Sequence, residues 1–384
     1  MGLFWRVLGM GILLLPFIGL GGCDLSGRAA EGDSAGGGAE TLSIMTWNVQ
    51  ALFDGEETGD EYDEYLNSAG WSGEKYASRL NVMGRAIGGM GTGAPDILAL
   101  EEVENAGVLE ELAAGPLGKH GYRWVFFANN SGSSLGIGIL SRLPLLNTRA
   151  HSLSFNGETT PRPVMEVWVD TGDKPPALFI CHWKSKLGGD DVTEGLRRAS
   201  ARIILRRMRE IRKENPHTPI AVMGDLNENH DEFYRKNGAF ITALIPDDPR
   251  AAELTGLYRA KGENADDSAE LIEELQADFL ILGKTKPPAA VYFPPGAAIL
   301  YSPWGRELEN GSYYYRNAWE TIDHVLLSES FFDGVGWDFD AVYTADQSPF
   351  TRAGGLPDAY NPRTGSGLSD HLPLVLTLKY MGDG

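Results

Sequence analysis

Polar side chains with metal-binding or proton-transfer chemistry recur at the ends of apolar segments in this chain. In PIAVMGDLN, residues 219–227, an apolar run typical of a buried strand is followed at once by Asp225 and Asn227. Two residues that are two positions apart in an extended strand point to the same side. Gly-Asp-x-Asn is also ordinary turn chemistry at a strand end, so this stretch alone favours a simple bend.

Other apolar segments begin or end in the same way. The residues are Asn48 after LSIMTW, Glu101 and Glu102 after DILAL, His182 followed by Lys184 and Lys186 after ALFIC, Asp323 within TIDHVLLS, and Ser369, Asp370 and His371 before LPLVLTL. A charged carboxylate that is buried without a partner costs several kcal/mol, so it needs a cation, a partner or a proton. One shared site explains this recurrence better than a series of unrelated turns.

The donor types in this set indicate a hard divalent cation. Carboxylate and amide oxygens are the ligands that Mg²⁺ and Mn²⁺ prefer, whereas structural zinc sites commonly use thiolates. The chain has only two cysteines, Cys23 and Cys181, and no disulfide framework is expected. We therefore expect Mg²⁺, or Mn²⁺, as the cofactor.

Several strands and helices must position these residues. Apolar runs predict strands at 42–49, 95–102, 122–128, 136–141, 163–170, 177–183, 219–225, 321–328 and 371–378. Helical spacing predicts helices at 75–90, 105–114 and 194–214. Many strands are apolar on both faces, which suits two stacked sheets covered by helices. Residues 241–320 are expected to form long loops around a single core.

The motifs resemble, in order, the series found in the endonuclease/exonuclease/phosphatase superfamily, which has the deoxyribonuclease I-like fold. The matching segments are TWNVQ, LALEEVEN, SLGIGILSR, CHWKSK, GDLN, IDHVLLS and SDHLPL. The resemblance implies an α+β fold, a four-layer α/β/β/α sandwich in which two mixed sheets pack face to face between helices. It also implies a single domain at 41–381.

The same resemblance implies a metal site and a set of catalytic residues. The metal ligands would be Asn48, Glu102 and Asp370. The catalytic residues would be His182, Asp225, Asn227, Asp323 and His371. Within this set, Asp225 would orient or deprotonate the attacking water, and Asp323 would orient His371. Asn227 would hold a phosphate oxygen, and His182 would contact the scissile phosphate as an acid or a charge stabiliser.

Three basic residues are candidates for substrate binding, although a solvated lysine pair is an equal alternative for two of them. They are Lys184, Lys186 and Arg162. One position departs from the family pattern, because Glu101 stands where relatives often have Gln. Its carboxylate could increase the need for cations, or it could lie outside the site, since adjacent strand residues point to opposite faces.

Phosphodiester hydrolysis requires these residue types. The substrate is anionic and repels hydroxide, so the site must neutralise its oxygens, form a nucleophile at neutral pH and assist the departing oxygen. A cation with His182 and Asn227 can meet the first need. Either Asp225 or the pair of Asp323 and His371 can meet the second, and the sequence leaves both alternatives open.

The N-terminal residues are expected to direct the chain to the bacterial cell envelope. The apolar run VLGMGILLLPFIGL has 14 residues, which is shorter than the roughly 20 residues of a membrane-spanning helix. It closes on LGGC, which resembles a lipoprotein processing box, with an ordinary signal peptide as the alternative. We expect a signal peptide at 1–22, an acylated Cys23 as membrane anchor, and a flexible tether of Gly, Ala and Ser over 23–40.

The net charge of −20 opposes general attraction to nucleic acid or anionic lipid. The exception is the basic run at 196–213, whose apolar residues recur at helical spacing. This pattern favours a solvated helix face over a nucleic-acid contact, which stays the alternative.

The expected function is divalent-metal-dependent hydrolysis of phosphodiester bonds by a monomeric, lipid-anchored, extracytoplasmic nuclease that acts on DNA or RNA. The alternative substrates are a lipid head group, an inositol phosphate or a small nucleotide. A non-catalytic surface-binding lipoprotein is a further alternative, but it would be expected to have lost motif residues, and none is lost.

Overall fold

The computed structural model describes residues 41–152, 154–155, 157–160, 162–172, 174–257, 278–294 and 296–382. The expected signal peptide at 1–22 and the expected tether at 23–40 lie outside the described residues. Among the helices that are described, none has the length and apolar character needed to cross a bilayer.

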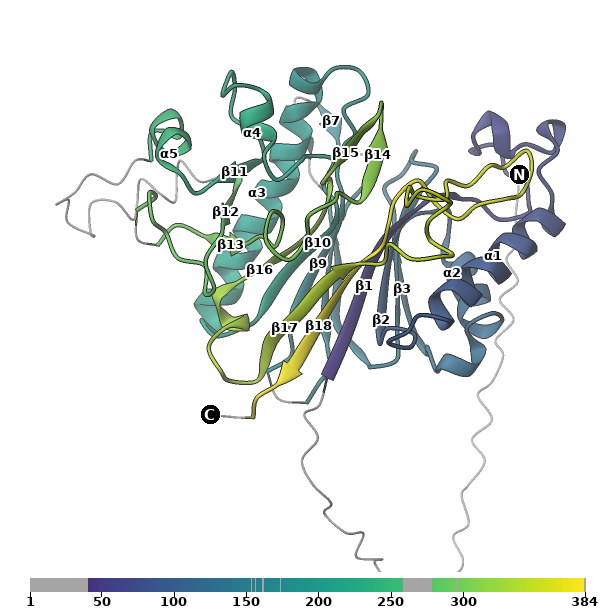
Figure 1. The fold of residues 1–384 in the computed structure, drawn as a ribbon, viewed down its shortest axis with the longest axis horizontal. Coiled ribbons are helices and arrows are strands. Elements are labelled where there is room, and N and C mark those ends of the chain that lie inside the picture. Colours follow the sequence, from purple (N-terminus) through teal and green to yellow (C-terminus); the bar gives the residue numbers. More distant parts are fainter. Residues whose placement is uncertain are drawn as a thin grey trace, which may run out of the picture. The chain divides into compact units, whose positions relative to one another are not determined.

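Two large mixed sheets form the centre of the domain (Figure 1). The six-stranded sheet has the order β17 (Trp337–Thr344), β18 (Leu374–Tyr380), β1 (Thr41–Leu52), β2 (Ile97–Val103), β4 (Gly136–Ser141) and β3 (Trp124–Ala128). The eight-stranded sheet has the order β11 (Leu244–Pro246), β12 (Leu280–Gly283), β13 (Ile299–Tyr301), β16 (Asp323–Leu327), β10 (Ile220–Asp225), β9 (Ala177–His182), β8 (Val164–Val169) and β5 (Leu145–His151).

Helices cover the outer face of each sheet (Figure 1). Those beside the six-stranded sheet are α1 (Gly73–Gly88) and α2 (Ala106–Ala114), and those beside the eight-stranded sheet are α3 (Asp190–Glu214), α4 (Glu232–Arg235) and α5 (Pro249–Thr255). The remaining elements are two small hairpins, β6 (Ser154–Phe155) with β7 (Glu158–Thr159) and β14 (Tyr313–Tyr315) with β15 (Ala318–Glu320), and the 3-10 helices η1 (Asp63–Tyr65), η2 (Asn67–Ala69), η3 (Gly118–His120) and η4 (Glu329–Phe331).

The central strands are apolar on both faces because each sheet is buried on both sides. In β1, Ile44 packs into the core between the two sheets, whereas Met45 and Trp47 pack into the core under α1 and α2. In β10, Met223 joins the core between the sheets and Val222 joins the core under α3. The predicted four-layer sandwich is therefore confirmed.

The prediction of long loops over 241–320 is wrong. Within the described part of this region, β11, β12 and β13 extend one edge of the eight-stranded sheet, and β14 and β15 form a separate hairpin. Each of these strands has only three or four residues. Periodicity over so few residues is too short to separate a strand from a loop.

The basic run lies on α3, as the apolar spacing predicts. Ile203, Ile204, Met208 and Ile211 are buried against the eight-stranded sheet. Arginines of the run form ion pairs: Arg198 with Asp278 at 2.8 Å, Arg207 with Glu166 at 2.7 Å and Arg212 with Glu329 at 2.6 Å. Because carboxylates already pair with these guanidinium groups, this helix is a poor surface for a polyanion.

Candidate active site

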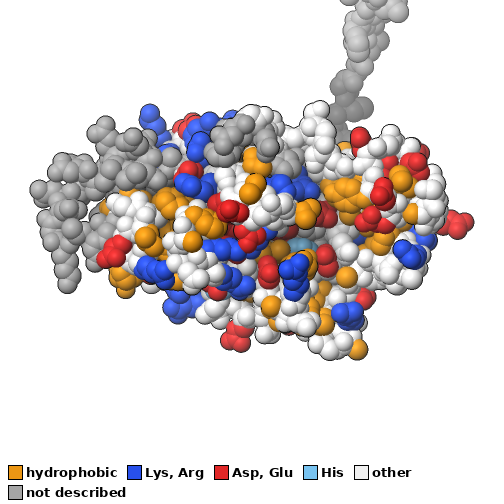
Figure 2. Space-filling view, turned by 90° about the horizontal axis from the view of Figure 1, so that it is seen from above, with side chains coloured by type: hydrophobic (Ala, Val, Ile, Leu, Met, Phe, Trp, Pro, Cys, Tyr) orange, Lys and Arg blue, Asp and Glu red, His pale blue; other side chains and the backbone are white. Residues whose placement is uncertain are grey.

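A hydrogen bond between the two sheets joins the predicted site residues at one rim of the sandwich. The Asn48 amide on β1 donates to Asp225 Oδ2 on β10 at 3.0 Å, and its nitrogen lies 3.4 Å from Glu102 Oε1 on β2. On the eight-stranded sheet, His182, Asp225 and Asp323 are register partners across three neighbouring strands. Viewed onto this rim, Figure 2 shows a histidine surface near the middle, surrounded by acidic, basic and hydrophobic side chains.

Glu102 reaches the rim through an irregularity in two neighbouring strands. The pairing of β1 with β2 shifts in register after Asn48, and Gln50, Ala51 and Glu102 have φ values of 55°, 54° and 65°. The Ala51 backbone N–H donates to Glu102 Oε2 at 2.7 Å. The other carboxylate oxygen lies 3.7 Å from His182 Nε2. The irregular backbone therefore fixes the carboxylate that is the principal candidate for a metal ligand.

The neighbouring Glu101 points away from the rim into the core. Its side chain is fully buried, Thr46 donates to Oε1 at 2.8 Å, and Oε2 has no hydrogen-bond partner among the described residues. Burial raises the pKa of Glu101 well above its usual value. Burial therefore disfavours the charged form of Glu101, and the carboxylates of Asp323 and Asp225 act in the same direction.

The GDLN segment combines a turn with a site. Gly224 has a φ of +123°, and a Cβ atom there would lie 2.0 Å from the Cys181 carbonyl oxygen. The Asn227 backbone N–H donates to Asp225 Oδ1 at 2.8 Å, and the Asn227 amide donates to the Trp183 carbonyl at 3.1 Å. The bend expected from turn chemistry is therefore present, and it places Asp225 and Asn227 beside the end of β9.

Replacing Gly224 with Ala is expected to lower the free energy of unfolding by about 2 kcal/mol or more, because the added carbon needs both a strained φ and a backbone shift. Urea denaturation would measure this change. The matched control is Gly91→Ala, since Gly91 is exposed and a Cβ atom there would meet no atom within 4 Å. Equal stability of the two variants would contradict the steric explanation.

His371 is fixed by contacts on three sides. Its Nδ1 lies 2.8 Å from Asp323 Oδ2, and the Ser312 hydroxyl donates to the same oxygen at 2.5 Å. The Tyr313 ring stacks on the imidazole, with ring centroids 4.5 Å apart. Burial alone would lower the pKa of His371, but the Asp323 carboxylate, with Asp370 and Asp225 near it, holds that pKa well above its usual value. These carboxylates therefore favour the positively charged form of His371.

The pKa of His182 is shifted in the opposite direction to that of His371. Burial lowers its pKa well below the usual value, and the charges of Arg162 and His371 act in the same direction. Its Nε2 lies 3.6 Å from Asp225 Oδ2. A neutral imidazole can donate a hydrogen bond to phosphate, but it carries no charge.

Asp225 titrates near neutral pH. Burial and the Asp323 carboxylate raise its pKa, whereas His371 and hydrogen bonds from Asn227 and Asn48 lower it. The net effect is a pKa raised to about 7. A carboxyl group with this pKa changes its protonation near neutral pH.

The donor set at this rim fits a hard divalent cation. Asp225, Asp323 and His371 each offer a ligand atom, and these atoms lie within 4.8 Å of one another. Glu102 and Asn48 reach the same place from the other sheet. Asp370 is held beside them by its backbone N–H, which donates to Gln50 Oε1 at 3.0 Å. Burial raises the pKa of Asp370, the charge of His371 lowers it, and the Glu102 carboxylate raises it, with an upward shift as the result.

The three predicted substrate contacts lie in different environments. The charge of Arg162 acts on His182 and on Tyr62, and its Nε has no hydrogen-bond partner among the described residues. Lys184 Nζ lies 3.4 Å from the carbonyl oxygens of Ser185 and Leu187.

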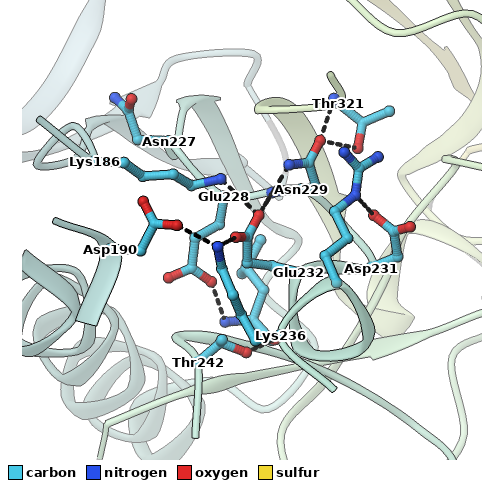
Figure 3. A network of polar contacts seen from close by, with 12 residues as sticks. Lys186, Asp190, Asn227, Glu228, Asn229, Asp231, Glu232, Lys236, Thr242 and Thr321 are labelled. Carbon is cyan, nitrogen blue, oxygen red and sulfur yellow. Dashed lines mark hydrogen bonds and ion pairs between the residues drawn. The ribbon is translucent and has the colours of Figure 1, made fainter. Parts of the chain in front are cut away.

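Lys186 belongs to a polar network, which Figure 3 shows. Its Nζ lies 2.6 Å from Glu232 Oε2, and Lys236 lies 3.3 Å from the other oxygen of Glu232. The Asn229 amide donates to Glu232 Oε2 at 2.9 Å. The Asn227 side chain stands apart from these contacts, so the network positions the loop after GDLN without using the amide predicted to hold phosphate.

Sequence reasoning missed the residues that support His371. Tyr313 is the first residue of β14 and Ser312 directly precedes it, inside the region expected to be loops. The run YYYRNAWE, residues 313–320, gives a usable signal, because aromatic residues on either side of Arg-Asn indicate a short hairpin.

The fold and the rim together define a hydrolase of phosphodiester bonds. Residues 43–252, more than half of the chain, match the endonuclease/exonuclease/phosphatase family, and the chain belongs to this family.

Solved structures are similar to this chain at low identity. Truncated Caenorhabditis elegans TDP2 is 14% identical with a TM-score of 0.46, and the match covers 88% of this chain and 97% of that one. An endonuclease/exonuclease/phosphatase family protein from Bacteroides thetaiotaomicron is 14% identical with a TM-score of 0.48, covering 89% and 99%. The human Nocturnin catalytic domain is 15% identical with a TM-score of 0.45, covering 89% and 97%. No curated protein matches the chain by sequence.

Proposed function

We propose that this protein is a divalent-metal-dependent phosphodiesterase that uses Mg²⁺ or Mn²⁺ and cleaves DNA or RNA outside the cytoplasm. The observation that carries the proposal is the 3.0 Å hydrogen bond from Asn48 to Asp225, because it joins the sheet that carries Glu102 to the sheet that carries His182, Asp225 and Asp323. Such a mixture of carboxylates, amides and imidazoles suits an anionic substrate with a bound cation.

The cation would be held on the Glu102 side of the rim, with Asn48 and Asp370. The contact between Asp323 and His371 Nδ1 at 2.8 Å supports this choice, because it engages these two side chains with each other. When bound, a divalent cation would neutralise phosphate oxygens and the charge that develops on the departing oxygen.

Asp225 is the better candidate for the general base. Its pKa of about 7 allows it to accept a proton from the attacking water at neutral pH. His371 is already protonated, so the pair of Asp323 and His371 suits the stabilisation of negative charge on phosphate. His182 and Asn227 would donate hydrogen bonds to the other phosphate oxygens.

Nucleic acid is the proposed substrate class because guanidinium and aromatic groups lie close to the rim. Arg162 carries a charge that acts directly on His182. The proposed binding is local, and the net charge of −20 leads us to expect salt-sensitive affinity.

The proposal predicts that purified protein hydrolyses bis-p-nitrophenyl phosphate, single-stranded DNA or RNA with millimolar Mg²⁺ or Mn²⁺, and that a chelator abolishes this activity reversibly. Glu102→Gln should require at least about tenfold more cation for half-maximal activity. Rates measured over a metal titration would test both points.

A substrate panel separates the alternatives. Activity on an inositol phosphate or a lipid head group without activity on either nucleic acid would contradict the proposed substrate. Hydrolysis that is unaffected by a chelator would contradict the proposed metal dependence.

A further inference from the structure

We propose that a cavity beside His371 binds one unpaired nucleoside next to the scissile phosphate, with Tyr315 as the ring on which its base stacks. This inference rests on the proposed function and names a subsite for it. The cavity has a volume of about 680 Å³, and its walls come from the loop after β9, the loop after β10 and the β14–β15 hairpin. We call it the hairpin cavity.

The hairpin cavity opens directly from the catalytic rim. Asn227, the candidate phosphate ligand, is one of its lining residues. Tyr313 lines the cavity and stacks on His371, with ring centroids 4.5 Å apart and planes inclined by 26°. The hairpin cavity therefore borders the rim through Asn227 and Tyr313.

The hairpin presents an exposed aromatic surface to the cavity. Tyr313 and Tyr315 project from the same side of β14 and stack with centroids 6.0 Å apart and an interplanar angle of 15°. Tyr314 points the other way and packs on Trp319. Tyr315 is 46% exposed, and the guanidinium of Arg316 lies 5.1 Å from its ring centroid. A planar cation already uses the ring as a stacking surface, and a nucleobase can use it in the same way.

The shape of the hairpin fixes this surface. Arg316 and Asn317, at its tip, have φ values of 48° and 65°, as in the tight two-residue turns that join antiparallel strands. A backbone bridge also pairs Tyr313 with His371. Tyr313 therefore contacts His371 through the main chain as well as through ring stacking.

Basic residues outnumber acidic ones around the hairpin cavity, in contrast to the protein as a whole. Most of them are paired with carboxylates, Arg235 with Asp231 and Lys236 with Asp190 among them. Four basic residues line it, Lys186, Arg235, Lys236 and Arg316, against three acidic ones, Asp190, Glu232 and Glu320. Glu232 is engaged by both lysines. Arg316 forms no ion pair with any described residue, and a base that displaces its guanidinium from the Tyr315 ring would leave it to contact a flanking phosphate.

These features favour a phosphoester that carries a nucleoside over the other phosphoesters of the substrate panel. An inositol ring or an alkyl chain has no π face to place on Tyr315, whereas each nucleobase has one. Binding cavities for small molecules measure roughly 300–1,000 Å³. The hairpin cavity is in this range and suits one nucleotide of a single strand or a strand end, not a duplex.

The test measures binding by calorimetry, so that it does not depend on turnover. The probes are thymidine 5′-monophosphate, thymidine 3′-monophosphate and 2-deoxyribose 5-phosphate, each with the full chain and Mg²⁺. At least one thymidine nucleotide should bind about tenfold or more tightly than the abasic sugar phosphate. Tyr315→Ala should remove that difference and leave the Kd of the sugar phosphate unchanged, and Tyr315→Phe should keep it. Tyr292→Ala, at another exposed tyrosine that does not line the cavity, should behave as the wild type.

Two results would overturn the inference. One is equal affinity of the wild type for both thymidine nucleotides and the sugar phosphate. The other is a nucleoside preference that persists in folded Tyr315→Ala. Either result is compatible with metal-dependent hydrolysis of phosphodiesters. A preference without hydrolysis of any substrate in the panel would instead refute the proposed function and keep the subsite.

Discussion

Replacing His371 with Ala is expected to lower kcat on bis-p-nitrophenyl phosphate by about 10²- to 10⁴-fold. The imidazolium ion is held against the Asp323 carboxylate at 2.8 Å and is kept charged by the acidic groups around it. Its removal deletes the positive charge that faces the phosphate and leaves Asp323 buried without its partner. Steady-state rates at saturating Mg²⁺ would measure the effect.

Three further variants show whether the loss is specific. His217→Ala replaces an exposed histidine outside the rim and should keep wild-type activity. Asp323→Asn should reduce kcat in the same direction, because it removes the charge that holds His371 protonated. The double variant of Asp323 and His371 should be little worse than His371→Ala, as expected for residues that act as one unit. A folded His371→Ala variant with a rate within twofold of the wild type would rule out the proposed role.

Replacing Arg197 with Met is expected to lower the free energy of unfolding by about 3–5 kcal/mol. Arg197 is only 1% exposed, and its guanidinium contacts Glu228 at 2.9 Å and Glu194 at 2.7 Å. The substitution would leave both carboxylates buried without a cation. Glu228 also accepts the Leu244 backbone N–H at 3.0 Å, so the loss would loosen the contact between α3 and β11.

Arg206→Met is the matched control for this prediction. It makes the same replacement on the same helix at an exposed position, where changes of within about 0.5 kcal/mol are usual. Urea denaturation of both variants gives the comparison. Similar stability of the two variants would mean that the attraction within the buried ion pairs only offsets the free energy lost when their charges are removed from water.

Much of the fold could be predicted from single segments. The run LSIMTWNV is apolar on both alternating sides, and only a strand buried on both faces satisfies such a sequence. The edge strands β11, β12 and β13 could not be predicted in this way. Each is three or four residues long, and its pairing comes from neighbours that are distant in sequence.

The candidate site was predictable in its composition but not in its electrostatics. The sequence places Asp225, Asp323 and His371 at strand ends, where side chains from neighbouring strands can meet. It cannot assign a proton to any of them, since the pKa of each depends on burial and on charges that arrive from other strands. The proposal of Asp225, and not the pair of Asp323 and His371, as general base therefore rests on the tertiary structure.

The sequence by itself determined the four-layer sandwich, the family and the residue types at the rim, because strand periodicity and motif order are local properties of the chain. Only the tertiary structure decided that Glu102 faces the rim while Glu101 is buried behind it, that Lys186 pairs with Glu232, and that a tyrosine hairpin stands beside His371. The physical reason is that these outcomes depend on a backbone irregularity and on contacts between segments far apart in the chain. Their free energies arise only when both sheets are assembled.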